Sequence, residues 1–239
     1  MSGAAVSLVA AASEYYRGAG LFAWQFARGK LAGDPVFAAI LAQGLLAGRA
    51  RILDLGCGQG LLAAWLMAAQ HCHAGAGWPA GWPAPPALSS YRGVEINARE
   101  AARARHAFAL DALARAQIVQ GDIADVDYGT ADAVVILDVL HYIDPDAQER
   151  VLERVRAALG ATGVLLLRVG DADAGLAFGI SAAVDRAVVL LRRGRWRRLS
   201  TRPLAQWRAV LERLGFESLV LPMSQGTLFA NMLLVARAR

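Results

Sequence analysis

Apolar residues in this chain follow two kinds of spacing, and their alternation predicts an α/β fold. Short unbroken apolar runs bounded by glycine or charged residues indicate buried strands, and longer stretches with apolar residues three or four apart indicate helices. Strands are expected at 52–55, 91–96, 117–122, 131–143 (with the loop that ends this stretch), 162–169, 216–221 and 227–236. The fold class predicted is a Rossmann-like, seven-stranded, mostly parallel sheet with helices on both faces and an antiparallel C-terminal strand.

Residues 13–48 differ from the rest, because glycine and proline divide them into two or three expected helices and no strand. Their aromatic residues are dense for a surface segment. These rings either pack on the edge of the sheet or belong to a lid over a ligand. We therefore expect residues 1–48 to form a helical N-terminal lid, and residues 49–239 to form one α/β domain in which 171–200 are a cap insertion.

Composition limits the other possibilities. The 239 residues suffice for one α/β domain, and the net charge of +5 comes almost wholly from arginine, since Lys30 is the only lysine. With so much alanine, this usage is typical of a GC-rich bacterial genome, so the charge alone does not indicate nucleic-acid binding. Two cysteines form no disulfide framework, and the apolar run 61–69 is too short to span a bilayer. We expect a cytoplasmic protein that is not integral to a membrane.

The candidate chemistry begins at I-L-D-L-G-C-G-Q-G, residues 52–60. Here an apolar strand meets a helix through three glycines, which allow a tight turn and a close approach of ligand to main chain. Asp54 is a carboxylate in an apolar strand, so its desolvation requires hydrogen bonds or a cation. The G-x-G-x-G spacing fits neither the dinucleotide fingerprint nor the phosphate loop. A ligand that is both nucleoside-like and positively charged suits this combination.

Two further acidic residues lie at the ends of the next two expected strands. Glu95 ends the strand at 91–96, where a carboxylate can accept both hydroxyls of a ribose, and dinucleotide folds also place an acid there. Asp122 ends the strand at 117–122, although a Gly-Asp pair is also a common turn. Independent turns would seldom place Asp54, Glu95 and Asp122 at three successive strands, so the series favours a nucleoside site.

These stretches resemble the motifs of the class I S-adenosylmethionine-dependent methyltransferases. The run 52–60 is similar to the first motif, Gly93-Val94-Glu95 to the second, and 138–141 (D-V-L-H) to the fourth in its small-molecule form. The resemblance implies S-adenosyl-L-methionine as cofactor, adenine contacts from Asp122 and Ile123, and a substrate loop after the fourth strand. The cofactor-binding residues it implies are Tyr16, Asp54, Gly56, Cys57, Gly58, Glu95, Ile96, Asp122, Ile123 and Asp138.

His141 and Tyr142 are the candidate catalytic residues of this substrate loop. An imidazole titrates near pH 6.5, so His141 could accept a proton from a phenol as the methyl group transfers. It could instead only shape the pocket, and Tyr142 could hold the substrate. No metal is expected, because adjacent residues such as His71, Cys72 and His73 cannot easily share one ion, and we interpret 71–86 as a surface loop.

Partner predictions concern residues 171–200, where a helix is expected at 176–191 before the basic run Arg192–Arg198. This run is either a solvated surface or a docking patch for an acidic acyl carrier protein or an anionic membrane surface. Residues 16–31 and 34–37 also resemble the opening of methyltransferases of bacterial aryl polyene pigment pathways. That resemblance implies C- or O-methylation of an aromatic, small or carrier-bound acceptor.

Two other functions remain open from the sequence. A dinucleotide-dependent oxidoreductase would also use a glycine-rich turn and an acid at position 95. A catalytically inactive protein would keep the cofactor site without methyl transfer. No nucleic-acid partner is expected, because the Asp/Asn-Pro-Pro-aromatic form of the fourth motif, typical of enzymes that methylate nucleobase amino groups, is absent.

Overall fold

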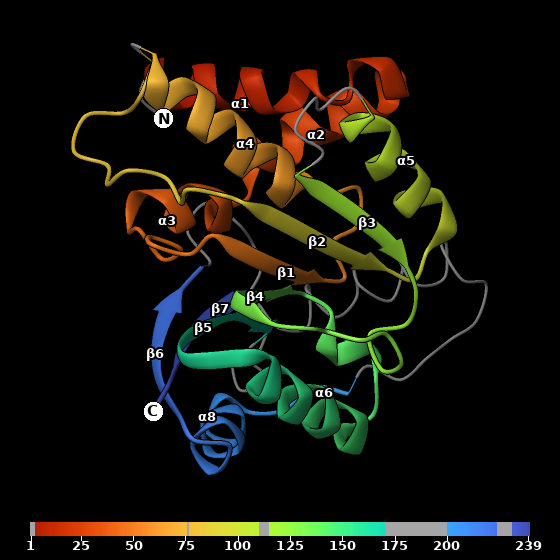
Figure 1. The fold of residues 1–239 in the computed structure, drawn as a ribbon, viewed down its shortest axis with the longest axis vertical. Helices are drawn as coiled ribbons and strands as arrows, with labels where there is room; N and C mark the ends of the chain where they lie inside the picture. Colours follow the sequence, from red (N-terminus) through yellow and green to blue (C-terminus); the bar gives the residue numbers. More distant parts are fainter. Residues whose placement is uncertain (1–2, 76, 110–114, 171–199, 224–230) are drawn as a thin grey trace. The chain divides into compact units, whose positions relative to one another are not determined.

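The computed structural model of the chain describes residues 3–75, 77–109, 115–170, 200–223 and 231–239. These residues form two compact units, Met1–Ala133 and Val134–Arg239. Among the described residues, seven strands lie in one sheet in the order β3-β2-β1-β4-β5-β7-β6. The predicted Rossmann-like, mostly parallel sheet with antiparallel C-terminal strands is confirmed (Figure 1).

The first unit opens with helices, as predicted. They are α1 (Gly3–Glu14), the 3-10 turn η1 (Arg17–Ala19), α2 (Leu21–Gly33) and α3 (Pro35–Ala42). Helix α1 packs against α2 and against α4 (Leu61–Ala74), which follows the glycine-rich turn. The side chain of Asp34 accepts a hydrogen bond from the Val36 N–H and Pro35 fills the first helical position, so local chemistry determines where α3 begins. The role of these helices as a lid stays a prediction.

Three parallel strands carry the acids of the predicted site. They are β1 (Arg51–Leu55), β2 (Ser90–Glu95) and β3 (Ala116–Gln120), with β2 between the other two. In their register Asp54 lies opposite Gly93, and Gly93 lies opposite Ile118. Helix α5 (Ala98–Phe108) packs on β2 and β3 and is capped by the Asn97 side chain. Because parallel strands end at the same edge of a sheet, this register brings the ends of all three strands together.

Two boundaries in this unit differ from the sequence predictions. Helix α4 continues to Ala74, so His71 and His73 lie in its last turn and not in a loop. The alanine-rich stretch before them favours helix, and Gly75 provides the end. The sequence also predicts a helix that follows the strand at 91–96 and reaches residue 115. Helix α5 ends at Phe108, and residues 110–114 lie outside the described residues.

The second unit contains the antiparallel part of the sheet. Strand β4 (Ala131–Leu137) begins in the first unit and ends in the second, and β5 (Leu159–Gly170), β6 (Phe216–Pro222) and β7 (Asn231–Ala238) follow. Strand β7 pairs antiparallel with both β5 and β6. Helix α6 (Pro145–Ala158) packs on β5 and α8 (Leu204–Arg213) on β6. The sequence Asp144-Pro145 predicts a helix start, since proline suits a first turn. Asp144 caps α6 through the Ala147 N–H at 2.8 Å, and Pro145 is the first helical residue.

The sequence around Thr201-Arg202-Pro203-Leu204 predicts a helix that runs to Leu214, with Thr201 as its cap and Pro203 in its first turn. The predicted start is wrong, because Pro203 is the N-cap residue of α8 and the first helical residue is Leu204. A proline at this place has no side-chain acceptor, so the helix start carries no side-chain cap. The expected helix at 176–191, the basic run Arg192–Arg198 and residues 227–230 lie outside the described residues. Within the residues that the structure describes, no helix is long and apolar enough to cross a membrane.

Candidate functional site

The glycine-rich turn of residues 56–60 is fastened to β2 by its backbone. The N–H groups of Gly56 and Cys57 both donate to the Val94 carbonyl, at 2.8 and 3.0 Å. Gly56, Gly58 and Gly60 have φ of 80°, 56° and 77°, a backbone region that residues other than glycine rarely adopt. A Cβ built on Gly58 meets no described atom within 4 Å. The turn therefore presents bare main chain to a ligand at Gly58.

Glu95 joins this turn to the end of the third strand. One carboxylate oxygen accepts from the Gly58 N–H at 3.0 Å and the other from the Asn97 N–H at 2.7 Å. The Glu95 backbone carbonyl accepts from the Gly121 N–H at 3.1 Å. A carboxylate oxygen has two lone pairs, so each retains capacity for one more donor, such as a hydroxyl. The ends of β1, β2 and β3 are thus connected through one residue.

Asp54 lies one residue before the end of β1 and is 4% exposed. Burial raises the pKa of this carboxyl to about 7; the hydrogen bond from the Tyr91 hydroxyl opposes this shift, and the negative charge of Glu95 adds to it. The ionised form is therefore costly in the absence of a positive charge. A cationic group placed beside Asp54 would stabilise the carboxylate, which is the property that the sequence predicted for this position.

Tyr16 is fully buried, and its hydroxyl donates to the Gln59 carbonyl at 2.8 Å. The structure therefore gives Tyr16 a role in supporting the glycine-rich turn, whereas its direct contact with a cofactor stays a prediction. Cys57 is buried in the same turn, and desolvation raises the pKa of its thiol well above the usual value. Its Sγ would lie 2.7 Å from a Cβ on Gly93, so Cys57 packs directly on β2.

The residues predicted to contact adenine lie just after the end of β3. Asp122 lies two residues beyond β3, and its carboxylate accepts from the Ala124 N–H at 2.9 Å. Ile123 is buried, whereas Ile96, next to Glu95, is 45% exposed and offers an apolar surface to a flat ring. The structure therefore brings together in one unit the glycine-rich turn and all three acids predicted from the sequence.

The candidate acceptor residues lie in the second unit, after β4. Asp138 has a φ of 59°, and its carboxylate accepts two hydrogen bonds from Arg168, one of them from Nε at 2.9 Å. Arg168 is 2% exposed, so the ion pair neutralises a buried guanidinium. This partner was not predicted from the sequence, although an arginine inside the apolar strand at 162–169 was the available signal. A cofactor contact from Asp138 stays a prediction.

His141 and Tyr142 belong to the 3-10 turn η2 (Leu140–Tyr142), and both are half-buried. Their ring centroids are 4.1 Å apart at an interplanar angle of 59°. The His141 carbonyl accepts from the Ser200 N–H at 2.9 Å. The turn is therefore held by a residue far away in the sequence, while the catalytic roles of His141 and Tyr142 stay predictions.

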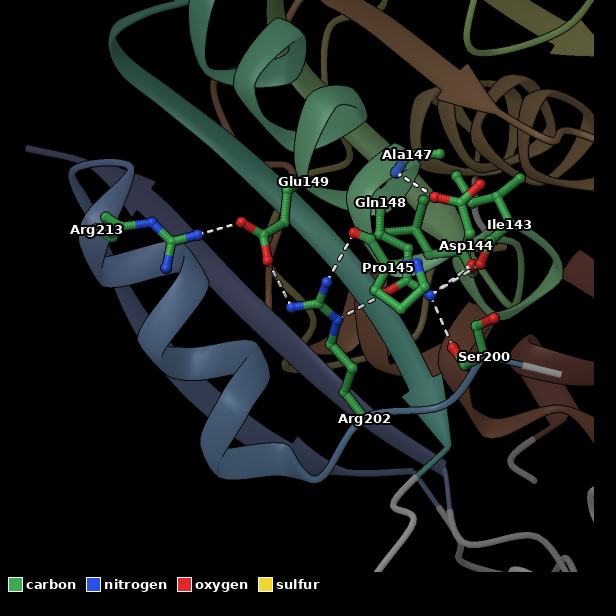
Figure 2. Close-up of polar contacts among 10 residues, drawn as sticks. Ile143, Asp144, Pro145, Ala147, Gln148, Glu149, Ser200, Arg202 and Arg213 are labelled. Carbon is green, nitrogen blue, oxygen red and sulfur yellow. Dashed lines mark hydrogen bonds and ion pairs between the residues drawn. The ribbon is translucent and has the colours of Figure 1, made fainter.

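Two polar residues of this region were not predicted from the sequence. Gln148 is fully buried on α6, and Arg202 bonds to it and to Glu149 (Figure 2). The only local sign was a glutamine three residues before Val151, on the face of the helix expected to be apolar. Among the residues described here, no group of three or more histidine, cysteine, aspartate or glutamate side chains could hold a metal ion.

Comparison with known proteins concerns the class of domain and the fold. Residues 53–165, a little under half of the chain, match the family model described as a methyltransferase domain. The chain is 34% identical over 140 residues to the carboxy-S-adenosyl-L-methionine synthase of Chromohalobacter salexigens, a match that covers 56% of this chain and 47% of that protein. The chain therefore spans about half the length of this curated relative.

Solved structures show the fold. An O-methyltransferase family protein from Burkholderia thailandensis superposes with a TM-score of 0.65 at 17% identity, covering 93% of this chain and 61% of that one. The magnesium protoporphyrin IX methyltransferase of Synechocystis, solved with bound S-adenosylhomocysteine, gives 0.60 at 21% identity, covering 95% and 94%. The strand order agrees with these structures, and the matched family model covers the glycine-rich turn and the strands that follow it, as far as residue 165. The fold is that of S-adenosylmethionine-dependent methyltransferases of known structure, and residues 53–165 are similar to a methyltransferase domain, in agreement with the motifs.

Proposed function

We propose that the chain binds S-adenosyl-L-methionine in its first unit and transfers the methyl group to a carbon or oxygen atom of a small or carrier-bound aromatic acceptor. The observation that carries the proposal is the position of Glu95, whose carboxylate bonds the Gly58 N–H of the glycine-rich turn and whose carbonyl bonds the Gly121 N–H. Glu95 thus links the Gly58 main chain, which would face the methionine part of the cofactor, to the segment that carries Asp122, the acid expected to face adenine.

Each acid has a distinct task in this proposal. Asp54 pairs with the α-ammonium group of the cofactor. The positive charge of that group offsets the cost of ionising the Asp54 carboxyl, whose pKa is raised by burial. Glu95 accepts the two ribose hydroxyls through the free lone pairs of its oxygens. Asp122 accepts the exocyclic amine of adenine, while Ile96 and Ile123 pack on the ring. When bound, the cofactor supplies an electrophilic methyl group on a positively charged sulfur.

Methyl transfer requires one base, which takes the proton that the acceptor loses. The acceptor oxygen or carbon forms a bond to the methyl carbon as the carbon–sulfur bond breaks, and the electron pair leaves on sulfur to give neutral S-adenosylhomocysteine. The proton lost by the acceptor goes to the imidazole of His141, and Tyr142 holds the acceptor ring. Positioning of the nucleophile and the methyl carbon provides much of the rate acceleration, since correct orientation alone is worth several kcal/mol, roughly 7–11 in favourable cases.

Two observations support the class of acceptor. One superposed structure is an O-methyltransferase family protein, and the mitomycin 7-O-methyltransferase also superposes, with a TM-score of 0.59. The resemblance of residues 16–31 to aryl polyene pathway enzymes points to an aromatic acceptor as well. We propose that the basic run Arg192–Arg198 docks an acidic acyl carrier protein, which a pull-down with Arg195→Glu/Arg198→Glu would test. Undiminished capture would remove this run from the proposal.

The first experiment is a calorimetric titration of S-adenosylhomocysteine into the wild type, into Glu95→Gln, and into the matched control Glu217→Gln, an exposed glutamate of β6. Loss of charge-assisted hydrogen bonds should weaken binding by about 1.5–3 kcal/mol, roughly tenfold to over a hundredfold, with the control unchanged. Nicotinamide cofactor binding with no response to S-adenosylhomocysteine would instead support the oxidoreductase alternative.

Transfer is tested next with methyl-labelled cofactor and a panel of phenolic and aryl carboxylic acids. His141→Gln should lower kcat by about 10²–10⁴-fold, because it removes the base without emptying its place. Its cofactor affinity should remain that of the wild type. An unchanged kcat would assign His141 to shaping the pocket, and cofactor binding without transfer to any acceptor would favour an inactive binding protein.

A further inference from the structure

The turn that carries His141 has its backbone carbonyls held from outside. The Leu140 and Ile143 carbonyls accept from Nε2 of Gln148 at 3.0 and 3.2 Å, and the His141 carbonyl accepts from the Ser200 N–H at 2.9 Å. Figure 2 shows the Gln148 amide between Ile143 and Ser200. Residues 140–143 are thus tied both to α6 and to the chain that precedes α8.

Gln148 is an unusual residue for its position. It is fully buried on the face of α6 that also buries Val151 and Val155. A buried amide destabilises the fold unless its donors and acceptor are all bonded. Besides the two carbonyls of the turn, Nε2 bonds the Ser200 carbonyl at 2.7 Å, so its two hydrogens serve three acceptors. The amide oxygen accepts from Nε of Arg202 at 2.8 Å.

Arg202 fixes the orientation of that amide. Its guanidinium donates to the Glu149 carboxylate at 2.8 Å and to the Pro145 carbonyl at 2.7 Å (Figure 2). Its Cζ lies 5.5 Å from the centroid of the Trp207 ring. The hydrogen bond from Arg202 lowers the pKa of Glu149, whose second oxygen pairs with Arg213. Because an arginine can only donate, it selects the amide orientation in which Nε2 faces the carbonyls of the turn.

We infer that Gln148, oriented by Arg202, is a positioning residue that fixes the backbone of residues 140–143 and thereby the direction of the His141 imidazole. This inference rests on the proposed function, in which that imidazole receives the acceptor's proton. Gln148 acts through the turn and touches neither cofactor nor acceptor.

The test compares Gln148→Met with Gln206→Met, a control that makes the same change on the exposed face of α8. Methionine keeps the volume and removes the donors. Amide exchange of residues 140–143 should rise at least about tenfold in Gln148→Met and stay unchanged in the control. Histidine NMR, with the His141 resonance assigned from His141→Gln, should show a displaced His141 titration curve while His71, His73 and His106 keep theirs.

A second variant, Gln148→Glu, applies if the methionine variant does not fold. It keeps the acceptor for Arg202 but cannot donate when ionised, so it should displace the His141 titration in the same way. Faster exchange with an unaltered His141 titration would show a purely structural role and overturn the inference. S-adenosylhomocysteine affinity should stay within about twofold in each variant, because Asp54, Glu95 and Asp122, which are proposed to hold the cofactor, lie in the first unit. Failure of the wild type to bind it would overturn the proposed function while leaving the NMR result to stand.

Discussion

The hydroxyl of Tyr91 donates a hydrogen bond to the carboxylate of Asp54, and both side chains are almost completely buried. The two residues lie on the neighbouring parallel strands β2 and β1. Burial raises the pKa of Tyr91 well above its usual value and that of Asp54 to about 7. Ionisation of Asp54 in this buried pair is therefore unfavourable, and both the pH and a cationic ligand should change how far it occurs.

The first prediction concerns stability and pH. Asp54 has a pKa of about 7 in the folded chain and an ordinary value near 3.8 when exposed, so the unfolded state loses its proton first. The free energy of unfolding should consequently fall as the pH rises from 4 to 7, by up to about 1.4 kcal/mol per unit from this group. Asp54→Asn should flatten this part of the profile in urea unfolding measured by circular dichroism.

Asp144→Asn serves as the control for that profile. The Ala147 N–H lowers the pKa of Asp144, so its contribution is present above the unfolded pKa and is lost as the pH falls. Asp54→Asn should make the slope of stability against pH less negative between pH 4 and 7, whereas Asp144→Asn should leave that range unchanged and alter the slope only at lower pH. Profiles of wild type and Asp54→Asn that run parallel between pH 4 and 7 would contradict the raised pKa.

The second prediction is that binding of S-adenosylhomocysteine releases a proton below pH 7. The ammonium group of the ligand should lower the pKa of Asp54, since an opposite charge favours the ionised form. Affinity should therefore increase from pH 6 to pH 8. At pH 6 the binding enthalpy should vary with the ionisation enthalpy of the buffer in the wild type but not in Asp54→Asn. Equal buffer dependence in both proteins would assign the proton to another group.

A third prediction addresses packing beneath the glycine-rich turn. A Cβ on Gly93 would lie 2.7 Å from Sγ of Cys57 and 2.9 Å from Cδ1 of Ile118. Gly93→Ala should lower the free energy of unfolding by about 1–3 kcal/mol through overpacking. Gly160→Ala is the matched control, because a Cβ there meets nothing within 4 Å. Adding Cys57→Ala should recover part of the loss, and no recovery would place the clash elsewhere.

The fourth prediction concerns Asp138 and Arg168. Asp138→Asn keeps the shape and tolerates the left-handed backbone, but it removes the negative charge with which Asp138 pairs the buried guanidinium of Arg168. We expect a loss of about 3 kcal/mol in the free energy of unfolding, measured by urea denaturation. The double variant Asp138→Asn/Arg168→Met should be more stable than Asp138→Asn alone. If the single variant costs nothing, the pair does not hold the end of β4.

Local chemistry explains the parts of the fold that the sequence predicted well. Asp144 with Pro145, and the glycines at 56, 58 and 60, determine a helix start and a turn through their own hydrogen bonds and dihedral angles. An apolar run containing one acid was enough to place Asp54 in a buried strand. These features require no knowledge of distant residues.

Contacts between distant residues were beyond such reasoning. Asp138 and Arg168 are 30 positions apart, and the Gln148 amide meets Ser200 52 positions away. In both pairs the polar residue is visible in the sequence, but its partner is known only from the tertiary fold. The helical turn at His71 and His73 was missed for a related reason, since neighbouring residues decide whether middling helix formers continue a helix.

The hydrogen bond from Tyr16 to the Gln59 carbonyl bears on protein engineering. A chimaera could be designed in which the N-terminal segment of one protein with this fold replaces that of another, with the aim of changing acceptor preference. In this chain such a graft would cut a buried link between the segment and the glycine-rich turn. A transplanted segment would need a tyrosine at the same place to leave the turn intact, so the choice of donor is limited by a residue that need not touch any acceptor.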